Sequence, residues 1–125
     1  MTAEAEEKLK VAVVGACASG KSTLVTALRQ EGYEARHVAQ EHSYVPSMWQ
    51  RISQPDVLVY LDVDFQTIKS RRPHLNFKPE HLAEQNRRLA HARQSCHLYL
   101  DTRDLSPKIV RDRTLSFLQE FRPRS

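Results

Sequence analysis

Residues 9–22 have the sequence LKVAVVGACASGKS, and this stretch decides the fold class that the chain predicts. Leu9 to Val14 is a short apolar run, rich in β-branched residues, that ends at Gly15, which is typical of a buried strand. The segment that begins at Lys21, KSTLVTALRQ, has its apolar residues at helical spacing. The sequence therefore predicts a strand and a helix joined by a short loop that contains two glycines.

This joining loop, Gly15 to Ser22, matches G-x-x-x-x-G-K-[ST], the pattern of a phosphate-binding loop, and we call it the glycine loop. Glycines let the backbone curl so that successive N–H groups face one anion, and the helix that follows adds its positive end. Lys21 supplies a full charge near the β- and γ-phosphates, and the Ser22 hydroxyl is placed to ligate Mg²⁺. The chance of this pattern in a chain of this composition is about 4 × 10⁻⁴. We predict nucleotide phosphate binding by Gly15, Ala16, Cys17, Ala18, Ser19, Gly20, Lys21, Ser22 and Thr23.

Strand-like and helix-like segments alternate along the rest of the chain. Residues 56–63 are the strongest strand pattern, because residues 57–61 are continuously apolar between two aspartates, which is typical of a strand covered on both faces of a parallel sheet. Weaker strand patterns lie at 33–40 and 97–101, and helices are expected over 46–52, 64–72, from Pro79 to about Cys96, and from Pro107 onward. We therefore predict an α/β fold, a small three-layer parallel sheet of about four strands. It forms one domain over 9–122, after a flexible tail at 1–8.

Length and composition restrict the class of protein. The chain has 125 residues, of which 40% are hydrophobic and 27% charged, as in a globular domain. It contains no apolar run of the roughly 18–20 residues that span a bilayer, so no membrane role is expected. The acidic N-terminus lacks the apolar core of a secretory signal, which favours a cytoplasmic protein. Two cysteines make no disulfide framework, and the six histidines show no zinc-ligand spacing.

Positive charge is concentrated in the middle of the chain. Residues 66–100 contain seven Lys or Arg against two Asp or Glu, whereas residues 1–65 contain six against nine. Such a stretch is expected to face a phosphate-rich ligand or a nucleic acid, or to form a solvated helical face. Nucleic acid is disfavoured because Phe77 is the only aromatic residue near these cations before residue 99. We expect residues 66–96, the basic segment, to act as a lid.

Together with two later stretches, the glycine loop resembles the P-loop kinases, the group that includes shikimate, adenylate and thymidylate kinases. These stretches are VLVYLDVDFQTIKSRR at 57–72 and YLDTRDLSPKIVRDRTLSFL at 99–118. The resemblance implies a P-loop NTPase architecture that binds ATP and Mg²⁺. It places Arg71 and Arg72 where these kinases carry lid arginines, and Thr102 and Arg103 in the loop that borders the base. Asp62 resembles the acid that ends a Walker B strand, and could orient the Mg²⁺ shell.

The sequence departs from these kinases in the segment expected to bind the phosphoryl acceptor. These kinases have a long acceptor-binding segment where this chain has only the short segment from Tyr33 to Pro55. Within it, Glu41 follows the second expected strand, at the edge where open parallel sheets bind ligands. Glu41 is a candidate to hold Mg²⁺ through water or to act as general base, and it could equally be a solvated carboxylate. His42 is a weaker candidate, and Tyr44 and Trp49 line an acceptor pocket or belong to the core.

The expected function is ATP-dependent transfer of the γ-phosphate to a small nucleotide or hydroxylated metabolite, by a monomer or homodimer. The candidate catalytic residues are Lys21, Glu41, Asp62, Arg71 and Arg72, with Ser22 and Asp62 as candidate metal ligands. The alternative is a nucleotide-binding or slowly hydrolysing ATPase module without an acceptor substrate. A GTPase is disfavoured, because the chain has no NKxD motif and no Asp three residues before any glycine.

Overall fold

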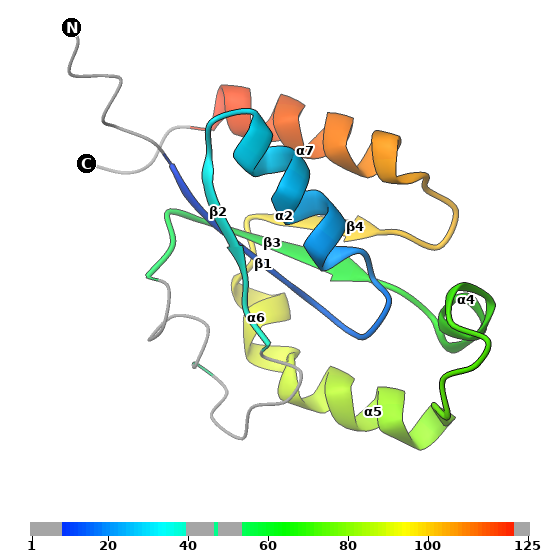
Figure 1. Cartoon of the computed structure of the whole chain (residues 1–125). Helices are drawn as coiled ribbons and strands as arrows, with labels where there is room; N and C mark the ends of the chain where they lie inside the picture. The colour runs from blue at the N-terminus through cyan, green and yellow to red at the C-terminus, as the bar shows by residue number, and fades with distance from the viewer. Residues whose placement is uncertain (1–8, 40–46, 48–53, 122–125) are drawn as a thin grey trace, which may run out of the picture.

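Four strands form one parallel sheet in the order β2-β1-β3-β4 (Figure 1). The computed structural model describes residues 9–39, 47 and 54–121. The strands are β1 (Lys10–Gly15), β2 (Glu34–His37), β3 (Val57–Asp62) and β4 (Leu98–Asp101). The prediction of an α/β fold with a four-stranded parallel sheet is thus confirmed. The predicted tail at 1–8 and most of the helix predicted at 46–52 lie outside the described residues.

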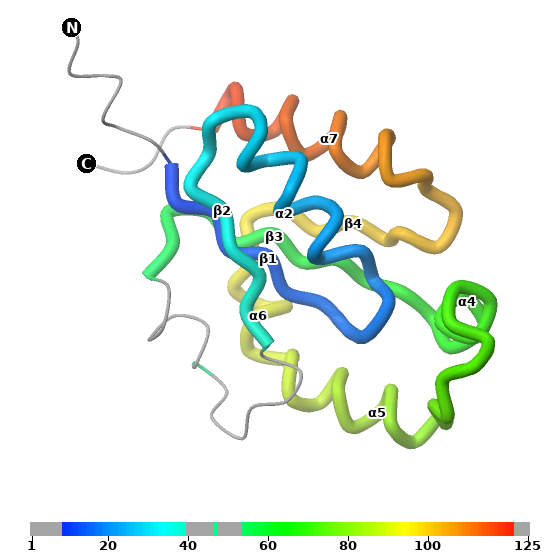
Figure 2. Tube along the Cα trace, in the orientation of Figure 1, coloured from blue at the N-terminus to red at the C-terminus, as the bar shows by residue number. Residues whose placement is uncertain are grey.

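Helices cover both faces of this sheet (Figures 1 and 2). On one face, α2 (Lys21–Gln30) and α7 (Pro107–Glu120) pack on the odd-numbered residues of β1 and β3. On the other face, α4 (Phe65–Arg71) and α6 (Ala90–Ser95) contribute Ile68 and Ala92 to a second core, and α5 (Pro79–Arg88) comes between them in the chain. Because both faces are covered, β1 and β3 are apolar without alternation.

Side-chain caps lie at the starts of α4 and α7, two helices that begin close to where the sequence predicts a helix. The Asp64 side chain accepts from the backbone N–H of Thr67 at 2.9 Å at the start of α4. Ser106 accepts from the N–H of Ile109 at 3.2 Å and precedes Pro107 at the start of α7. Both caps satisfy N–H groups that have no partner within the helix.

The prediction of a single helix from Pro79 to about Cys96 is wrong, because the structure has two helices there, α5 and α6, which meet at Leu89. The two halves bury different partners. α5 turns Gln85 toward the glycine loop, whereas α6 packs Ala92 into the core beneath β3. Leu89 itself is fully buried at the junction.

Within the described part of the chain, no helix is both long and apolar enough to cross a membrane.

Candidate functional site

The glycine loop connects the end of β1 to the first turn of α2 (Figure 1). Two of its residues have positive φ angles, Ala18 at 61° and Gly20 at 100°. Gly20 is the N-cap of α2, so no side chain caps this helix end, and the first turn carries no acidic residue. The space beside the Gly20 Cα is open to 4 Å. The positive end of α2 is therefore left for an acceptor from outside the helix.

Gly15 is required for a different reason, which is the close approach of two backbones. A Cβ at this position would lie well under 3.0 Å from the carbonyl oxygen of Leu61 on β3 and from the Ser19 hydroxyl. Ser19 is only 3% exposed, and its Oγ is buried with no hydrogen-bond partner among the described residues. The loop is thus folded tightly onto the end of β3.

Lys21 turns its side chain back over the loop. Its Nζ donates to the carbonyl oxygen of Gly15 at 2.6 Å. Ser22 and Thr23 follow in the first turn of α2, and both side chains are exposed. An ammonium group, two hydroxyl groups and an uncapped helix end are therefore gathered within a few residues, which is a donor set suited to an anion.

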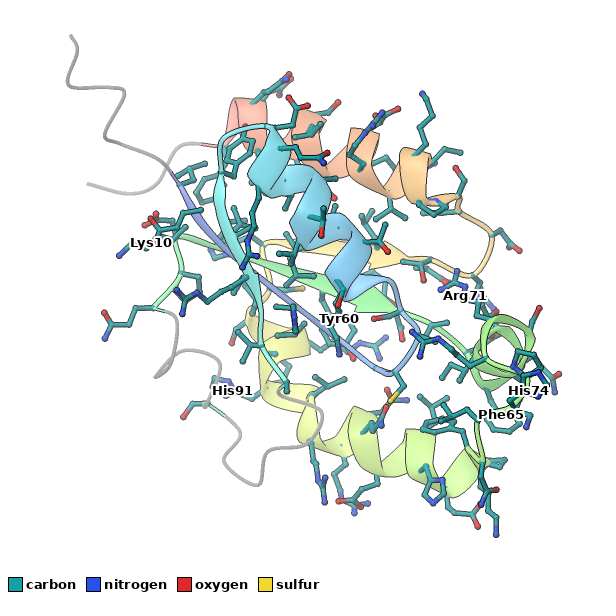
Figure 3. All side chains as sticks on the ribbon, viewed as in Figure 1. Lys10, Tyr60, Phe65, Arg71, His74 and His91 are labelled. Atoms are coloured by element: carbon teal, nitrogen blue, oxygen red, sulfur yellow. The ribbon has the colours of Figure 1, made fainter. Side chains whose placement is uncertain are left out.

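Arg71, at the end of α4, joins the glycine loop to the segment that follows β4 (Figure 3). Its guanidinium donates to the Ala18 carbonyl at 2.7 Å and to the Thr102 carbonyl at 2.6 Å. Thr102 is in turn held by its backbone N–H and its hydroxyl, which both donate to the Asp62 carbonyl at 2.9 Å. The structure therefore brings together residues that lie far apart in the sequence and were each predicted to meet the nucleotide.

A cavity of about 260 Å³ opens where these segments meet. Its wall has a polar side from the glycine loop, the α4 arginines and Thr102, and an apolar side from α2 and the start of α7. The lining residues are Ala18, Ser19, Gly20, Thr23, Leu24, Arg71, Arg72, Thr102, Leu105, Pro107 and Val110. The cavity is slightly smaller than most pockets that enclose a whole ligand.

Asp62, predicted as a metal-orienting acid, directs its carboxylate away from this cavity. Its Oδ2 accepts from the Tyr99 hydroxyl and lies 3.7 Å from Arg93, and its Oδ1 accepts from the N–H of Val63 at 2.9 Å. Arg93 also lies over the rings of Tyr60 and Tyr99, which stack on each other. The carboxylate thus belongs to a cluster on the face of the sheet that α6 covers.

Two tyrosines in this cluster hold their protons tightly. Burial, and then the negative charge of Asp62, raise the pKa of Tyr60 to about 12. Burial, and then the hydrogen bond to Asp62, raise the pKa of Tyr99 to about 12. At neutral pH both phenols are neutral, so Tyr99 serves as the hydrogen-bond donor to Asp62.

Arg103 does not line the cavity, although it was predicted to border the base. Its guanidinium is held by Asp101 at 2.9 Å and lies 3.8 Å from Asp64. Hydrogen bonds from the backbone and side chain of Arg103 lower the pKa of the Asp101 carboxyl. Arg72 does line the cavity, and its side chain is exposed.

The acceptor-side candidates Glu41, His42, Tyr44 and Trp49 lie outside the described residues. In the part of the chain that the structure does describe, no group of three or more His, Cys, Asp or Glu side chains is arranged to hold a metal ion.

Sequence reasoning missed the residue that holds the glycine loop from the far face of the sheet. Gln85 on α5 is 7% exposed and makes two contacts with Cys17. A signal was present, because Leu82, Gln85, Leu89 and Ala92 follow one another at helical spacing. An amide in the middle of such an apolar stripe indicates a buried polar group with a partner.

No protein-family model matches the sequence, and no curated protein is detectably similar to it. Function is therefore inferred from the residues and geometry of this chain.

Proposed function

We propose that the chain binds ATP with Mg²⁺ at the glycine loop and the adjoining cavity, and transfers the γ-phosphoryl group to a small nucleotide or hydroxylated metabolite. The observation that carries the proposal is the convergence of three distant segments. Ala18–Gly20, Arg71 and Thr102 line one cavity that begins at the loop and at the open end of α2. The proposal includes a P-loop NTPase architecture for the parallel sheet and its helices.

The residues present fit a triphosphate with its metal ion. Room beside Gly20, an uncapped helix N-terminus and the Lys21 ammonium suit a polyphosphate, and the exposed Ser22 hydroxyl would hold Mg²⁺. When bound, Mg²⁺ would neutralise charge on the phosphate oxygens. The partly apolar cavity formed with Leu24, Leu105 and Val110 suits a planar base, and its modest volume leaves the phosphates to the loop.

Two cations would assist transfer. Phosphoryl transfer depends mainly on positioning and on positive charge near the migrating group. Lys21 supplies one such charge from the loop. Arg72 would supply another, because it is exposed and lines the cavity. Arg71 instead donates to the Ala18 and Thr102 carbonyls, so we assign it a structural role, in which it holds the walls of the site together.

A second candidate function is an ATP-binding or slowly hydrolysing module that has no acceptor. The observation that favours it is the orientation of Asp62, whose carboxylate is bound by Tyr99 and Arg93 and does not line the cavity. Attack on the γ-phosphate, by an acceptor hydroxyl or by water, needs a group that orients the attacking oxygen or takes its proton. Glu41 is the remaining candidate for that role. The two functions differ in product and share the same nucleotide site.

Calorimetry with ATP and Mg²⁺ tests the shared site. We expect Lys21→Ala to weaken ATP binding by at least about 30-fold, which is about 2 kcal/mol, because it removes a charge-assisted contact to phosphate. The matched control is Lys10→Ala, which removes the same charge from the exposed far end of β1 (Figure 3). Equal ATP affinity in the Lys21 and Lys10 variants refutes the nucleotide site.

Product analysis then separates the two functions. The wild-type chain is incubated with ATP and Mg²⁺ and a panel of nucleosides, nucleotides and small hydroxylated metabolites. A phosphorylated acceptor formed together with ADP supports the kinase. Slow ADP release that no acceptor changes supports the module.

A further inference from the structure

Gln85 makes the side-chain contacts that connect α5 to the glycine loop. Its Oε1 accepts from the backbone N–H of Cys17 at 3.1 Å, and its Nε2 donates to the Cys17 sulfur at 3.1 Å. The side chain is 7% exposed, so water gives little support to either group. A buried amide paired in this way holds both the backbone and the side chain of one loop residue.

The residue that follows Cys17 has an unfavourable backbone conformation. Ala18 has a φ of 61°, in the left-handed region where an L-residue with a Cβ is strained. Such a conformation persists when the surrounding contacts determine it. Gln85 fixes the residue before it, and Arg71 donates to the Ala18 carbonyl at 2.7 Å. Two side chains from separate helices therefore hold the strained peptide from both sides.

We propose that Gln85 is a positioning residue that acts through Cys17, and that with Arg71 it holds the glycine loop in its anion-binding conformation. The inference rests on the proposed nucleotide site. Neither Gln85 nor Cys17 lines the cavity, so Gln85 acts on the site only through the conformation of the loop. Arg71 lines the cavity as well, which makes Gln85 the residue that reports on loop conformation alone.

The test compares Gln85→Met, which keeps length and removes both polar groups, with Gln94→Met on the exposed surface of α6. The probes are tripolyphosphate with Mg²⁺ and ATP with Mg²⁺, measured by calorimetry on variants shown to be folded by thermal unfolding. We expect Gln85→Met to lower the affinity for each probe by about tenfold, which is 1.4 kcal/mol. Gln94→Met is expected to leave both affinities unchanged.

A second background separates positioning from simple packing. In the Ala18→Gly background, glycine adopts a positive φ without strain, so the same Gln85→Met change is expected to cost less than about threefold. A merely structural role gives the same loss in both backgrounds, which overturns the proposal. Gln85→Met binding within twofold of the wild type overturns it as well.

If Gln85→Met fails to fold, Gln85→Glu provides the test. A carboxylate still accepts from the Cys17 N–H, loses the donation to sulfur and brings negative charge beside an anion site. The affinity of Gln85→Glu for tripolyphosphate, relative to that of the wild type, should be lowest at low salt and should recover only in part as salt is added, because screening removes the charge effect and not the loss of the donation to sulfur. An affinity unchanged from wild type overturns the inference. A wild-type chain that binds neither probe refutes the proposed function itself, whereas wild-type binding with no Gln85 effect refutes only this inference.

Discussion

Replacement of Gly15 by alanine tests whether backbone contact, and not backbone flexibility, requires glycine at the start of the loop. The φ angle of Gly15 is not positive, unlike those of Gly20 and Gly32, so alanine meets no conformational penalty there. The added methyl group would instead meet the Leu61 carbonyl and the Ser19 hydroxyl at well under 3.0 Å. A carbonyl oxygen within a central strand cannot rotate away without breaking the sheet.

We expect Gly15→Ala to lower the free energy of unfolding by about 3 kcal/mol, at the upper end of the range for overpacking. An unfolding entropy of about 2.1 cal/mol/K per residue converts this loss to a fall of about 11 °C in Tm for 125 residues. Chemical denaturation and thermal unfolding followed by circular dichroism measure the two quantities.

Gly32→Ala is the matched control. Gly32 has a φ of 95° with nothing within 4 Å, so alanine there costs only the conformational penalty of about 1 kcal/mol, or about 4 °C. A Gly15→Ala variant no less stable than Gly32→Ala refutes the steric argument. Adding Ser19→Ala to Gly15→Ala distinguishes the two obstacles, because it removes the hydroxyl and leaves the Leu61 carbonyl. We expect the double variant to recover only a minor part of the loss.

Two further predictions concern stability away from the loop. The Leu58 backbone N–H donates to Nδ1 of His97 at 2.9 Å, so His97→Ala should lower the free energy of unfolding by about 1–3 kcal/mol, because it leaves a buried N–H unpaired. His97→Asn restores an acceptor and should lose less stability. Equal stability of the two variants in urea would contradict this reasoning. The raised pKa values of Tyr60 and Tyr99, each about 12 against 10.0 in the unfolded chain, mean that the folded state holds these protons more tightly. Their contribution to stability is therefore complete below pH 10.0 and is lost as the pH rises toward about 12. Spectrophotometric titration of tyrosinate should show a late phase that shrinks in Tyr60→Phe and again when Tyr99→Phe is added; a titration unchanged by both substitutions argues against the assignment.

Local patterns were sufficient to predict most of the described elements. β3 was predicted because a continuous apolar run between Asp56 and Asp62 is typical of a strand covered on both faces. The starts of α4 and α7 were predicted close to Asp64 and Pro107, and each start is fixed locally, by an acceptor three residues before the N–H that it satisfies. These features depend on residues close together in the sequence.

The contacts that shape the candidate site were not predictable in the same way. Gln85 and Cys17 are 68 residues apart, and Arg71 and Ala18 are 53 residues apart. Which carbonyl an arginine binds depends on how helices pack, and no local periodicity contains that information. Asp62 shows the same limit. Its place at the end of a strand was predicted, but the direction of its carboxylate depends on Tyr99, on a neighbouring strand that comes much later in the chain.

The link between α5 and the loop has a thermodynamic consequence. If the Gln85 contacts favour the loop conformation that binds an anion, a bound anion must favour those same contacts by an equal free energy, since coupling between two sites is reciprocal. Occupancy would then slow amide hydrogen exchange in α5, on the opposite side of the sheet from α2. The helix that carries Arg87 and Arg88 would thus sense the ligand without touching it.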